Sequence, residues 1–154
     1  MPVKALTEFL DDHHVKYVTI KHSLAYTAQQ IAHSAHIPGK ELAKTVMVKL
    51  DGRMVMAIVR GPDRVDLERL RAVSRAEKVE LADEDEFRGM FPGVDPGAMP
   101  PFGNLYGMPV YVDERLAADE VIAFNAGTHS ELIELAYADF ERLVEPRVAR
   151  FAKP

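Results

Sequence analysis

One lysine, Lys44, lies in a stretch whose composition is typical of a β-strand, Leu42–Leu50. Side chains alternate across a strand, so Lys44 shares a face with the apolar residues Val46 and Val48. Burying an ammonium group without a partner costs free energy. Two interpretations follow: the amine reaches water at the rim along an apolar stem, or it lines a pocket and meets an anionic ligand.

A second candidate for chemistry is the loop over residues 91–103, which reads FPGVDPGAMPPFG and is too rich in proline and glycine for regular structure. Prolines restrict φ and glycines allow close backbone approach. The stretch 97–101 can therefore hold N–H groups aimed at a carbonyl or a phosphate. The alternative is a rigid surface crossover, which composition alone favours because most irregular loops only connect elements.

Three further features carry weaker signals. The small and polar residues 125–129 follow the end of a strand. Two interpretations are open, a ligand site and an ordinary turn, and these residues taken alone favour the turn. His22 precedes a turn that opens a helix, and helix amino termini attract anions. His33 and His36 have a spacing that suits a metal, but no third ligand accompanies them, so metal binding is disfavoured.

Composition limits the class of protein. The 154 residues, 47% hydrophobic and 28% charged, suit one globular domain. No apolar run is long enough for a membrane span and no leader is expected, so cytoplasm is the expected location. The absence of cysteine excludes disulfides, thiolate metal sites and cysteine nucleophiles. A net charge of −5 disfavours sequence-independent nucleic-acid binding but leaves room for a basic patch that reads one RNA end.

Local patterns predict the elements that position these residues. A capping box at Thr27 and Gln30 opens a helix. Asp51-Gly52 joins two strands into a hairpin, and the second strand is apolar on both faces and therefore central. Asp66 caps a further helix. The other expected helices cover residues 3–10 and 139–144 and follow the acidic run 83–86, and the other expected strands cover 17–22, 78–81, 109–113, 121–124 and 131–135.

The C-terminal residues 147–154 are expected to form a loosely held tail. Strands linked by hairpins and mixed with helices predict an α/β or α+β domain around a mostly antiparallel or mixed sheet. No nucleophile elbow, P-loop or dinucleotide fingerprint occurs in the chain.

These features occur in one order along the chain. They are His22-Ser23, Tyr26–Gln29, Leu42–Thr45, Asp66-Leu67, Gly97–Gly103, Asn125–Gly127 and Glu131–Ile133. In this order they resemble the YbaK/prolyl-tRNA-synthetase-associated editing domain family, freestanding trans-editing aminoacyl-tRNA deacylases. The resemblance covers about residues 17–144; no single motif is specific, but the ordered set is.

The resemblance implies a compact single α/β (α+β) domain over residues 1–154, with a mixed, mostly antiparallel, barrel-like sheet flanked by helices. It implies hydrolysis of the ester that joins a wrong amino acid to tRNA, without a metal, a cofactor or a protein nucleophile. The terminal ribose 2′-hydroxyl of the tRNA helps to activate water, and the protein positions the ester.

The resemblance also implies the site residues. The strand lysine of the family corresponds to Lys44, which would contact the terminal adenosine phosphate or the ester, and its Gly-x-x-x-Pro loop corresponds to Gly97 and Pro101. N–H groups near Ala98 and Met99 would stabilise the developing oxyanion. The residues expected to contact the substrate are His22, Tyr26, Thr27, Pro100, Phe102, Gly103, Asn125, Gly127 and His129.

The chain departs from bacterial members that act on cysteinyl-tRNA(Pro). Those members carry Ser-Gly-Gly near residues 125–127, an aspartate near Leu132 and a basic residue where His129 stands. The departures disfavour cysteine as the target and leave alanine, serine and threonine open.

The expected partners are the acceptor end of an aminoacyl-tRNA and a synthetase that assists tRNA selection, with no membrane or DNA partner. Two rival functions remain at this point. One is a non-catalytic module that binds tRNA ends or a synthetase, and the other is a hydrolase of small esters unrelated to tRNA.

Overall fold

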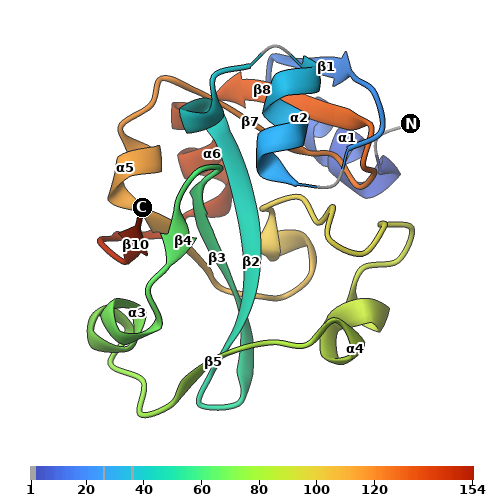
Figure 1. Cartoon of the computed structure of the whole chain (residues 1–154). Coiled ribbons are helices and arrows are strands. Elements are labelled where there is room, and N and C mark those ends of the chain that lie inside the picture. Colours follow the sequence, from blue (N-terminus) through green and yellow to red (C-terminus); the bar gives the residue numbers. More distant parts are fainter. Residues whose placement is uncertain (1–2, 26, 36) are drawn as a thin grey trace.

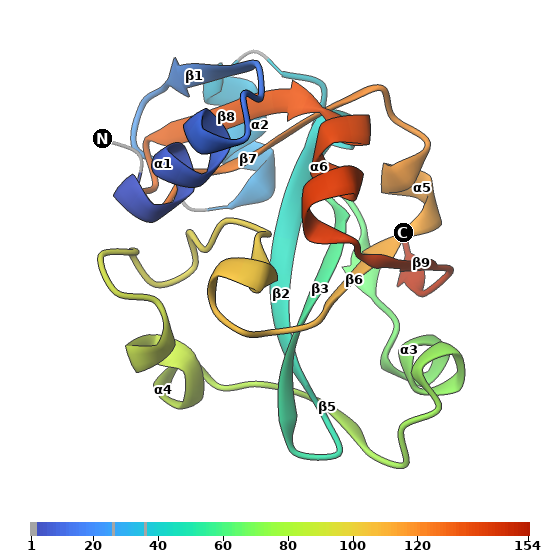
Figure 2. The same ribbon diagram turned by 180° about the vertical axis from the view of Figure 1, so that it is seen from behind.

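A computed structural model of the chain describes residues 3–25, 27–35 and 37–154, and a mixed β-sheet forms its centre (Figures 1 and 2). The strands are β1 (Tyr17–Lys21), β2 (Leu42–Leu50), β3 (Arg53–Arg60), β4 (Arg64–Val65), β5 (Val79–Leu81), β6 (Val110–Asp113), β7 (Val121–Asn125), β8 (Glu131–Ala136), β9 (Arg147–Ala149) and β10 (Ala152–Lys153). The helices are α1 (Lys4–Asp12), α2 (Ala28–Ala35), α3 (Leu67–Ser74), α4 (Glu84–Phe87), α5 (Glu114–Ala117) and α6 (Tyr137–Val144), with short 3-10 turns at Gly39–Glu41, Arg88–Met90 and Gly103–Leu105.

Across the described residues, the main sheet has the strand order β1-β8-β7-β2-β3-β6-β9, with β5 also beside β2. A separate ladder pairs β4 with β10. The β2–β7, β3–β6 and β6–β9 pairs are parallel, and the remaining pairs are antiparallel. The prediction of a mixed, mostly antiparallel sheet is therefore confirmed.

The β2–β3 hairpin forms the long axis of the sheet. Its turn residues Asp51 and Gly52 have φ values of 50° and 82°, the positive range that a two-residue hairpin turn requires. Leu50 pairs with Arg53 across the turn. β3 lies between β2 and β6 and is buried on both faces along most of its length, which confirms that this strand is central.

The sheet separates beside the middle of β2. Parallel pairing with β7 involves only Leu42 and Ala43 of β2, and pairing with β5 begins at Val48. Figure 1 shows β7, β8 and β1 crossing above the hairpin rather than continuing alongside it. Among the residues that the structure describes, one edge of β2 therefore has no neighbouring strand between Lys44 and Met47.

Helices cover both faces of the β7–β8 segment, with α1 and α2 on opposite sides (Figures 1 and 2). Leu10 of α1 and Phe140 of α6 belong to the same buried cluster as Ile133 of β8. Ile31 of α2 packs in a second cluster with the next residue of β8, Leu132. This alternation along β8 follows from the two-residue period of a strand. No helix in the described ranges combines the length and apolar character of a membrane span.

Both predicted N-terminal caps are confirmed. The Asp66 carboxylate accepts hydrogen bonds from the N–H groups of Glu68 at 3.1 Å and Arg69 at 3.2 Å. At the start of α2, Thr27 Oγ1 accepts from Gln30 N at 3.1 Å, and Gln30 Oε1 accepts from Thr27 N at 3.3 Å. These bonds satisfy backbone donors that a helix start leaves unpaired.

The expectation of a loosely held C-terminal tail is wrong. β9 pairs with β6 and β10 pairs with β4, and the Phe151 side chain is fully buried. The buried carboxylate of Asp113 accepts hydrogen bonds from the N–H groups of Phe151 and Ala152, both at 2.9 Å. The partner that orders the tail lies 38 residues away in the sequence, so the tail's own residues carry no signal for it.

Candidate active site

A pocket of about 980 Å³ opens along the free edge of β2. Leu42 accepts a hydrogen bond from Gly61 N, so the even-numbered residues of β2 bond to β3 and the odd-numbered ones direct their backbone groups outward. On this outer side Met47 O accepts from Ala82 N at 3.0 Å, whereas Thr45, which pairs with Ile58 of β3 on the other side, meets neither β5 nor β7. The pocket is bordered by β2, the start of α2, the turn after β3, the loop near Gly97 and the end of β7.

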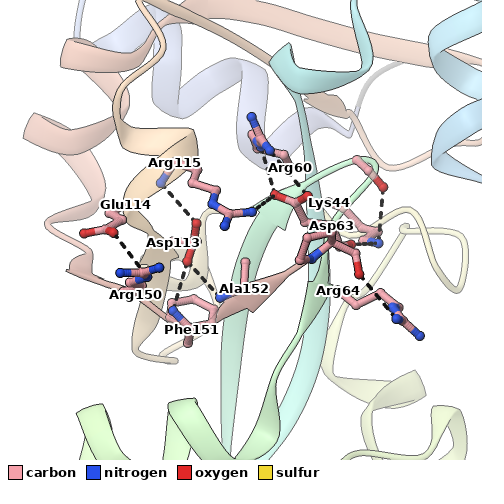
Figure 3. A network of polar contacts seen from close by, with 12 residues as sticks. Lys44, Arg60, Asp63, Arg64, Asp113, Glu114, Arg115, Arg150, Phe151 and Ala152 are labelled. Atoms are coloured by element: carbon pink, nitrogen blue, oxygen red, sulfur yellow. Dashed lines mark hydrogen bonds and ion pairs between the residues drawn. The ribbon is translucent and has the colours of Figure 1, made fainter.

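Lys44 lines this pocket and is held at its amine. Nζ donates to the carbonyl oxygen of Asp63 at 2.6 Å and to that of Gly61 at 3.3 Å (Figure 3). Burial lowers the pKa of Lys44 below its ordinary value, attraction to Asp63 opposes that decrease, and repulsion from Arg64 adds to it. An ammonium group has three N–H donors, so these two acceptors leave one donor for a ligand.

The pocket offers little other acid–base chemistry. Among the described residues that line it, Lys44 is the one with an ionisable side chain. Its neighbours on the wall are mostly small or apolar, such as Ala43 and Met47. The arrangement supplies a positive charge, but it places no carboxylate or imidazole of the described lining residues where a general base would act.

The loop over residues 91–103 supplies backbone donors to the same pocket. Gly97 has a φ of +85°, a conformation that favours glycine, and both Gly97 and Met99 line the pocket. Within the described part of the chain, the N–H groups of these two residues donate to no protein acceptor. The Ala98 N–H differs from the sequence-based expectation, because it donates to Asp95 O at 3.0 Å and closes a turn.

The loop is attached to the turn that follows β7. Asp95 N donates to Gly127 O at 2.8 Å, and Gly127 N donates to Ala98 O at 3.1 Å. The imidazole Nε2 of His129 lies 2.9 Å from Pro96 O. The two loops that the sequence singled out separately are therefore adjacent in space. Gly127 and His129 hold the first loop and do not line the pocket themselves.

Asn125 and Thr27 add polar groups to the pocket wall. Asn125 is the last residue of β7, and its buried Oδ1 accepts no hydrogen bond from the described residues. Thr27 caps α2, and Ala28 follows it on the wall, so the amino end of this helix faces the pocket. A carboxamide oxygen suits an ammonium ligand, whereas a helix amino terminus suits an anion.

Four of the expected site residues lie behind the wall. Pro100, Pro101, Phe102 and Gly103 are buried and do not line the pocket. The Phe102 ring makes edge contact with Phe140, with the ring centroids 5.4 Å apart. A Cβ on Gly103 would lie 2.5 Å from Met108 O, so glycine is required for that approach. These residues anchor the loop to the core.

Two expected substrate contacts have other positions. His22 lines a second, smaller hollow of about 260 Å³ beside Ser130, and its Nδ1 lies 2.7 Å from Ser23 O. Tyr26 lies outside the described residues. His36 of the disfavoured metal pair is outside them as well, and the described residues contain no cluster of three or more metal-ligating side chains.

Sequence reasoning missed the turn that holds Lys44. Gly61 and Asp63 accept its hydrogen bonds, and Gly61 and Pro62 line the pocket. The signal was the Gly61-Pro62 pair directly after a strand, which marks a turn. Nothing in that pair of residues indicates which distant side chain donates hydrogen bonds to the carbonyl groups of the turn.

With this geometry described, the relationship to known proteins can be stated. A family model described as an aminoacyl-tRNA editing domain matches residues 22–143. The chain belongs to the aminoacyl-tRNA editing domain family. Lys44, the Gly97 loop and Asn125 all fall within the matched residues.

The editing domain is similar in sequence to part of a larger enzyme. It is 34% identical over 76 residues to a proline–tRNA ligase of Staphylococcus saprophyticus, a match that covers 49% of this chain and 13% of that protein. The corresponding enzyme of Staphylococcus aureus strain Newman is 33% identical over 75 residues, again 13% of its length. The chain thus spans only a small part of these curated relatives.

Solved structures share the fold of the editing domain. One, described as a candidate trans-editing enzyme for prolyl-tRNA synthetase, has a TM-score of 0.82 at 21% identity, covering 98% of this chain and 96% of that one. Another, described only as a hypothetical protein, has a TM-score of 0.86 at 18% identity, covering 97% of this chain and 100% of that one. At this identity the likeness concerns the fold.

Proposed function

We propose that this editing domain is an aminoacyl-tRNA deacylase that hydrolyses the ester of a tRNA mischarged with a small amino acid. The observation that carries the proposal is one pocket that combines the Lys44 ammonium with the unpaired N–H groups of Gly97 and Met99. Membership of the aminoacyl-tRNA editing family supports the substrate class.

The pocket volume fits a terminal nucleoside with an amino acid attached. About 980 Å³ lies near the upper end of the ~300–1,000 Å³ typical of small-molecule sites. Side chains of Ile31, Met47 and Phe87 reach its wall. A methylene contributes only about 1–3 kcal/mol of attractive discrimination, so rejection of larger amino acids rests on steric exclusion by such walls. Alanine, serine and threonine are the proposed acyl groups.

The chemistry rests on positioning. Water adds to the ester carbonyl carbon, the bond from that carbon to the ribose oxygen breaks, and the ribose oxygen takes up a proton. The products are a free amino acid and uncharged tRNA. Because the described lining side chains offer no carboxylate or imidazole as a general base, the neighbouring ribose hydroxyl of the tRNA assists the water. An aminoacyl ester is already activated, so correct placement of water and carbonyl supplies much of the rate.

Each polar group of the pocket has a part in holding the ester. The N–H groups of Gly97 and Met99 stabilise the negative charge that develops on the carbonyl oxygen. The remaining donor of Lys44 binds the terminal phosphate or the ester oxygen as a point charge. Asn125 Oδ1 accepts a hydrogen bond from the α-ammonium of the amino acid. The amino end of α2 adds attraction for the phosphate.

The proposed partners are the acceptor end of an aminoacyl-tRNA and a synthetase. A net charge of −5 provides little general attraction to a phosphate backbone, so the chain alone selects tRNA weakly. The sequence match to proline–tRNA ligases makes a prolyl system the first to test.

The direct experiment measures ester loss from separate tRNAs charged with alanine, serine, threonine, cysteine or proline. We expect hydrolysis above the spontaneous rate for at least one of the first three, and none for prolyl-tRNA. No acceleration with any of them would reject the deacylase. Tight binding of a non-hydrolysable aminoacyl-tRNA analogue, together with no ester loss from the charged tRNAs, would instead favour a binding module.

A competition experiment separates tRNA editing from general ester hydrolysis. Uncharged intact tRNA should inhibit the reaction at lower concentration than free adenosine, because the intact acceptor end provides more of the proposed contacts. Equal inhibition by the two competitors would favour a hydrolase of small esters.

A further inference from the structure

The turn between β3 and β4 contains a buried carboxylate that the proposed mechanism does not use. Asp63 is 3% exposed and is not among the residues that line the pocket, and its carboxylate points toward two arginines (Figure 3). Arg60 donates through Nε at 2.8 Å and through Nη2 at 3.4 Å, one to each carboxylate oxygen. Arg115 of α5 lies 3.8 Å from the same carboxylate. A buried carboxylate needs such partners, since an unpaired one is costly.

The backbone of the same residue meets the pocket lysine. The Asp63 carbonyl accepts the shorter of the two hydrogen bonds from Lys44 Nζ, at 2.6 Å, and the Gly61 carbonyl accepts the other. Asp63 N also donates to Arg60 O at 2.9 Å, which closes the turn. The side chain of Asp63 therefore fixes the backbone oxygen on which the Lys44 amine rests.

The turn has little freedom to hold the lysine in any other way. Pro62 restricts φ within it. A Cβ on Gly61 would lie 3.1 Å from Gly39 O and 3.4 Å from the Ala28 side chain, so the turn is packed against the elements beside the start of α2. The ion pair between Arg60 and Asp63, neither of which lines the pocket, supplies a further constraint on the turn.

We propose that Asp63 is a positioning residue for Lys44: its carboxylate, bound by Arg60 and Arg115, holds the carbonyl that orients the Lys44 ammonium toward the ester. The assignment rests on the deacylase function proposed above. Asp63 itself touches no substrate atom and acts through the lysine. A misplacement of about 1 Å in such a group lowers a rate by as much as ~100-fold.

The charge of Asp63 also provides a measurement that does not depend on activity. The charged groups that act on the Lys44 ammonium are Asp63, which raises its pKa, and Arg64, which lowers it, while burial lowers it most. Arg60 and Arg115 face the Asp63 carboxylate from β3 and α5. Removal of the Asp63 charge should therefore lower the pKa of Lys44 further.

The test compares Asp63→Asn with Asp113→Asn. Asp113 is also buried and also accepts hydrogen bonds, from the C-terminal tail and from the N–H of Arg115 at 3.0 Å, where it caps α5. It does not contact Lys44, and the asparagine in Asp113→Asn keeps an oxygen that can accept from Arg115 N. Both variants lose stability, which melting curves measure, so stability alone does not distinguish them. Single-turnover deacylation over a range of enzyme concentrations separates the chemical rate from the half-saturation concentration. Carbon-detected NMR of the lysine side chains follows the titration of Lys44.

For Asp63→Asn we expect a chemical rate at least tenfold lower, a half-saturation concentration changed less than threefold, and a lower pKa for Lys44. For Asp113→Asn we expect a chemical rate and a Lys44 titration like those of the unmodified protein. Asp63→Glu restores the charge and should recover part of both the rate and the pKa.

Two results would overturn the assignment while leaving the deacylase in place. One is an unchanged chemical rate in Asp63→Asn, whatever its Lys44 titration. The other is an equal loss of rate in Asp113→Asn. If the unmodified protein were inactive on every mischarged tRNA, the proposed deacylase function would be rejected. The pKa of Lys44 in Asp63→Asn would then be the one test of whether Asp63 controls the environment of Lys44.

Discussion

The two lysines of β2 lie in contrasting surroundings at opposite ends of one strand. Lys49 Nζ is 2.6 Å from Glu86 Oε2 and 3.6 Å from Glu80 Oε1, and the hydrogen bond to Glu86 raises its pKa. Lys44 is held by two neutral carbonyl groups, and burial lowers its pKa. Carboxylates neutralise the Lys49 ammonium, whereas the Lys44 amine donates to neutral carbonyl groups.

The contrast arises from which neighbours each end of the strand receives. β5 runs beside Lys49 and leads into the acidic helix α4, so carboxylates reach that amine. Beside Lys44 the sheet separates, and the space is a pocket whose described lining residues include no carboxylate. Among the described residues, no carboxylate lies within ion-pair distance of the Lys44 amine, so the fold around this lysine, and not its own chemistry, leaves it accessible to a ligand.

The largest predicted effect concerns the two lysines directly. Lys44→Ala should lower the deacylation rate at least ~100-fold, the order of effect seen when one donor to a developing oxyanion is removed. Lys49→Ala should leave the rate within about twofold, because Lys49 does not line the pocket. Single-turnover rates and circular dichroism of both variants check this. Comparable losses in the two variants would contradict the contrast.

Next in size is the backbone of the Gly97 loop. Gly97→Ala should lower the rate about tenfold and destabilise the fold by ~1–2 kcal/mol, because φ is +85° there. Its new Cβ would lie 3.5 Å from His129 Cε1, an ordinary contact, so the cost is conformational. The matched control is Gly52→Ala, with φ of +82° and open space around it. Rates and urea unfolding should show similar destabilisation with loss of activity only in Gly97→Ala.

A smaller effect is expected from pH. The pKa of Lys44 lies below its ordinary value of 10.5, so its ammonium is lost as pH rises through that lowered pKa. The enzymatic rate, after subtraction of spontaneous hydrolysis, should therefore fall at a pH below 10.5. Lys44→Arg should be slower but should lack this decrease, because arginine stays charged. An identical alkaline decrease in Lys44→Arg would remove Lys44 as its cause.

The smallest predicted effect is on stability at the Lys49 end. The hydrogen bond from Lys49 lowers the pKa of Glu86 below its ordinary value of 4.5. A lowered carboxyl pKa stabilises the fold above the unfolded pKa, and that contribution is lost as pH falls through the folded pKa. Lys49→Ala should lower the melting temperature slightly at neutral pH, and the difference should close in acid. High salt should reduce it as well.

The sequence was sufficient to predict those structural features whose hydrogen-bonding or packing partners lie within a few residues in the chain. The Thr27–Gln30 and Asp66 caps and the Asp51-Gly52 turn depend on residues two or three positions apart, and all three formed as predicted. The face occupied by Lys44 followed from simple alternation, since Val46 and Val48 pack together in one cluster. Short-range hydrogen bonds and side-chain periodicity carry this information because the chain can satisfy them without knowledge of the whole fold.

The features that the sequence did not predict depend on hydrogen-bonding partners far away in the chain. The last residues were expected to be loose, yet Asp113 orders Phe151 and Ala152 from 38 and 39 residues away. Ala98 was expected to supply a free N–H, but it donates to Asp95 O within a turn. The distant partner of that turn is Gly127, which accepts from Asp95 N and donates to Ala98 O. These outcomes depend on which backbone groups meet after the chain has packed.

By itself, the sequence determined most of the longer helices and strands and their order, the lysine on an apolar strand face and the loop that breaks regular structure. It did not indicate the short elements α5, β4, β9 and β10. Only the tertiary structure decided that the sheet separates beside Lys44 and that the loop from Gly97 closes on the same pocket. It alone also brought a buried aspartate behind the lysine. The reason is physical: propensity and alternation act over a few residues, whereas a pocket exists only where segments far apart in the chain are packed together.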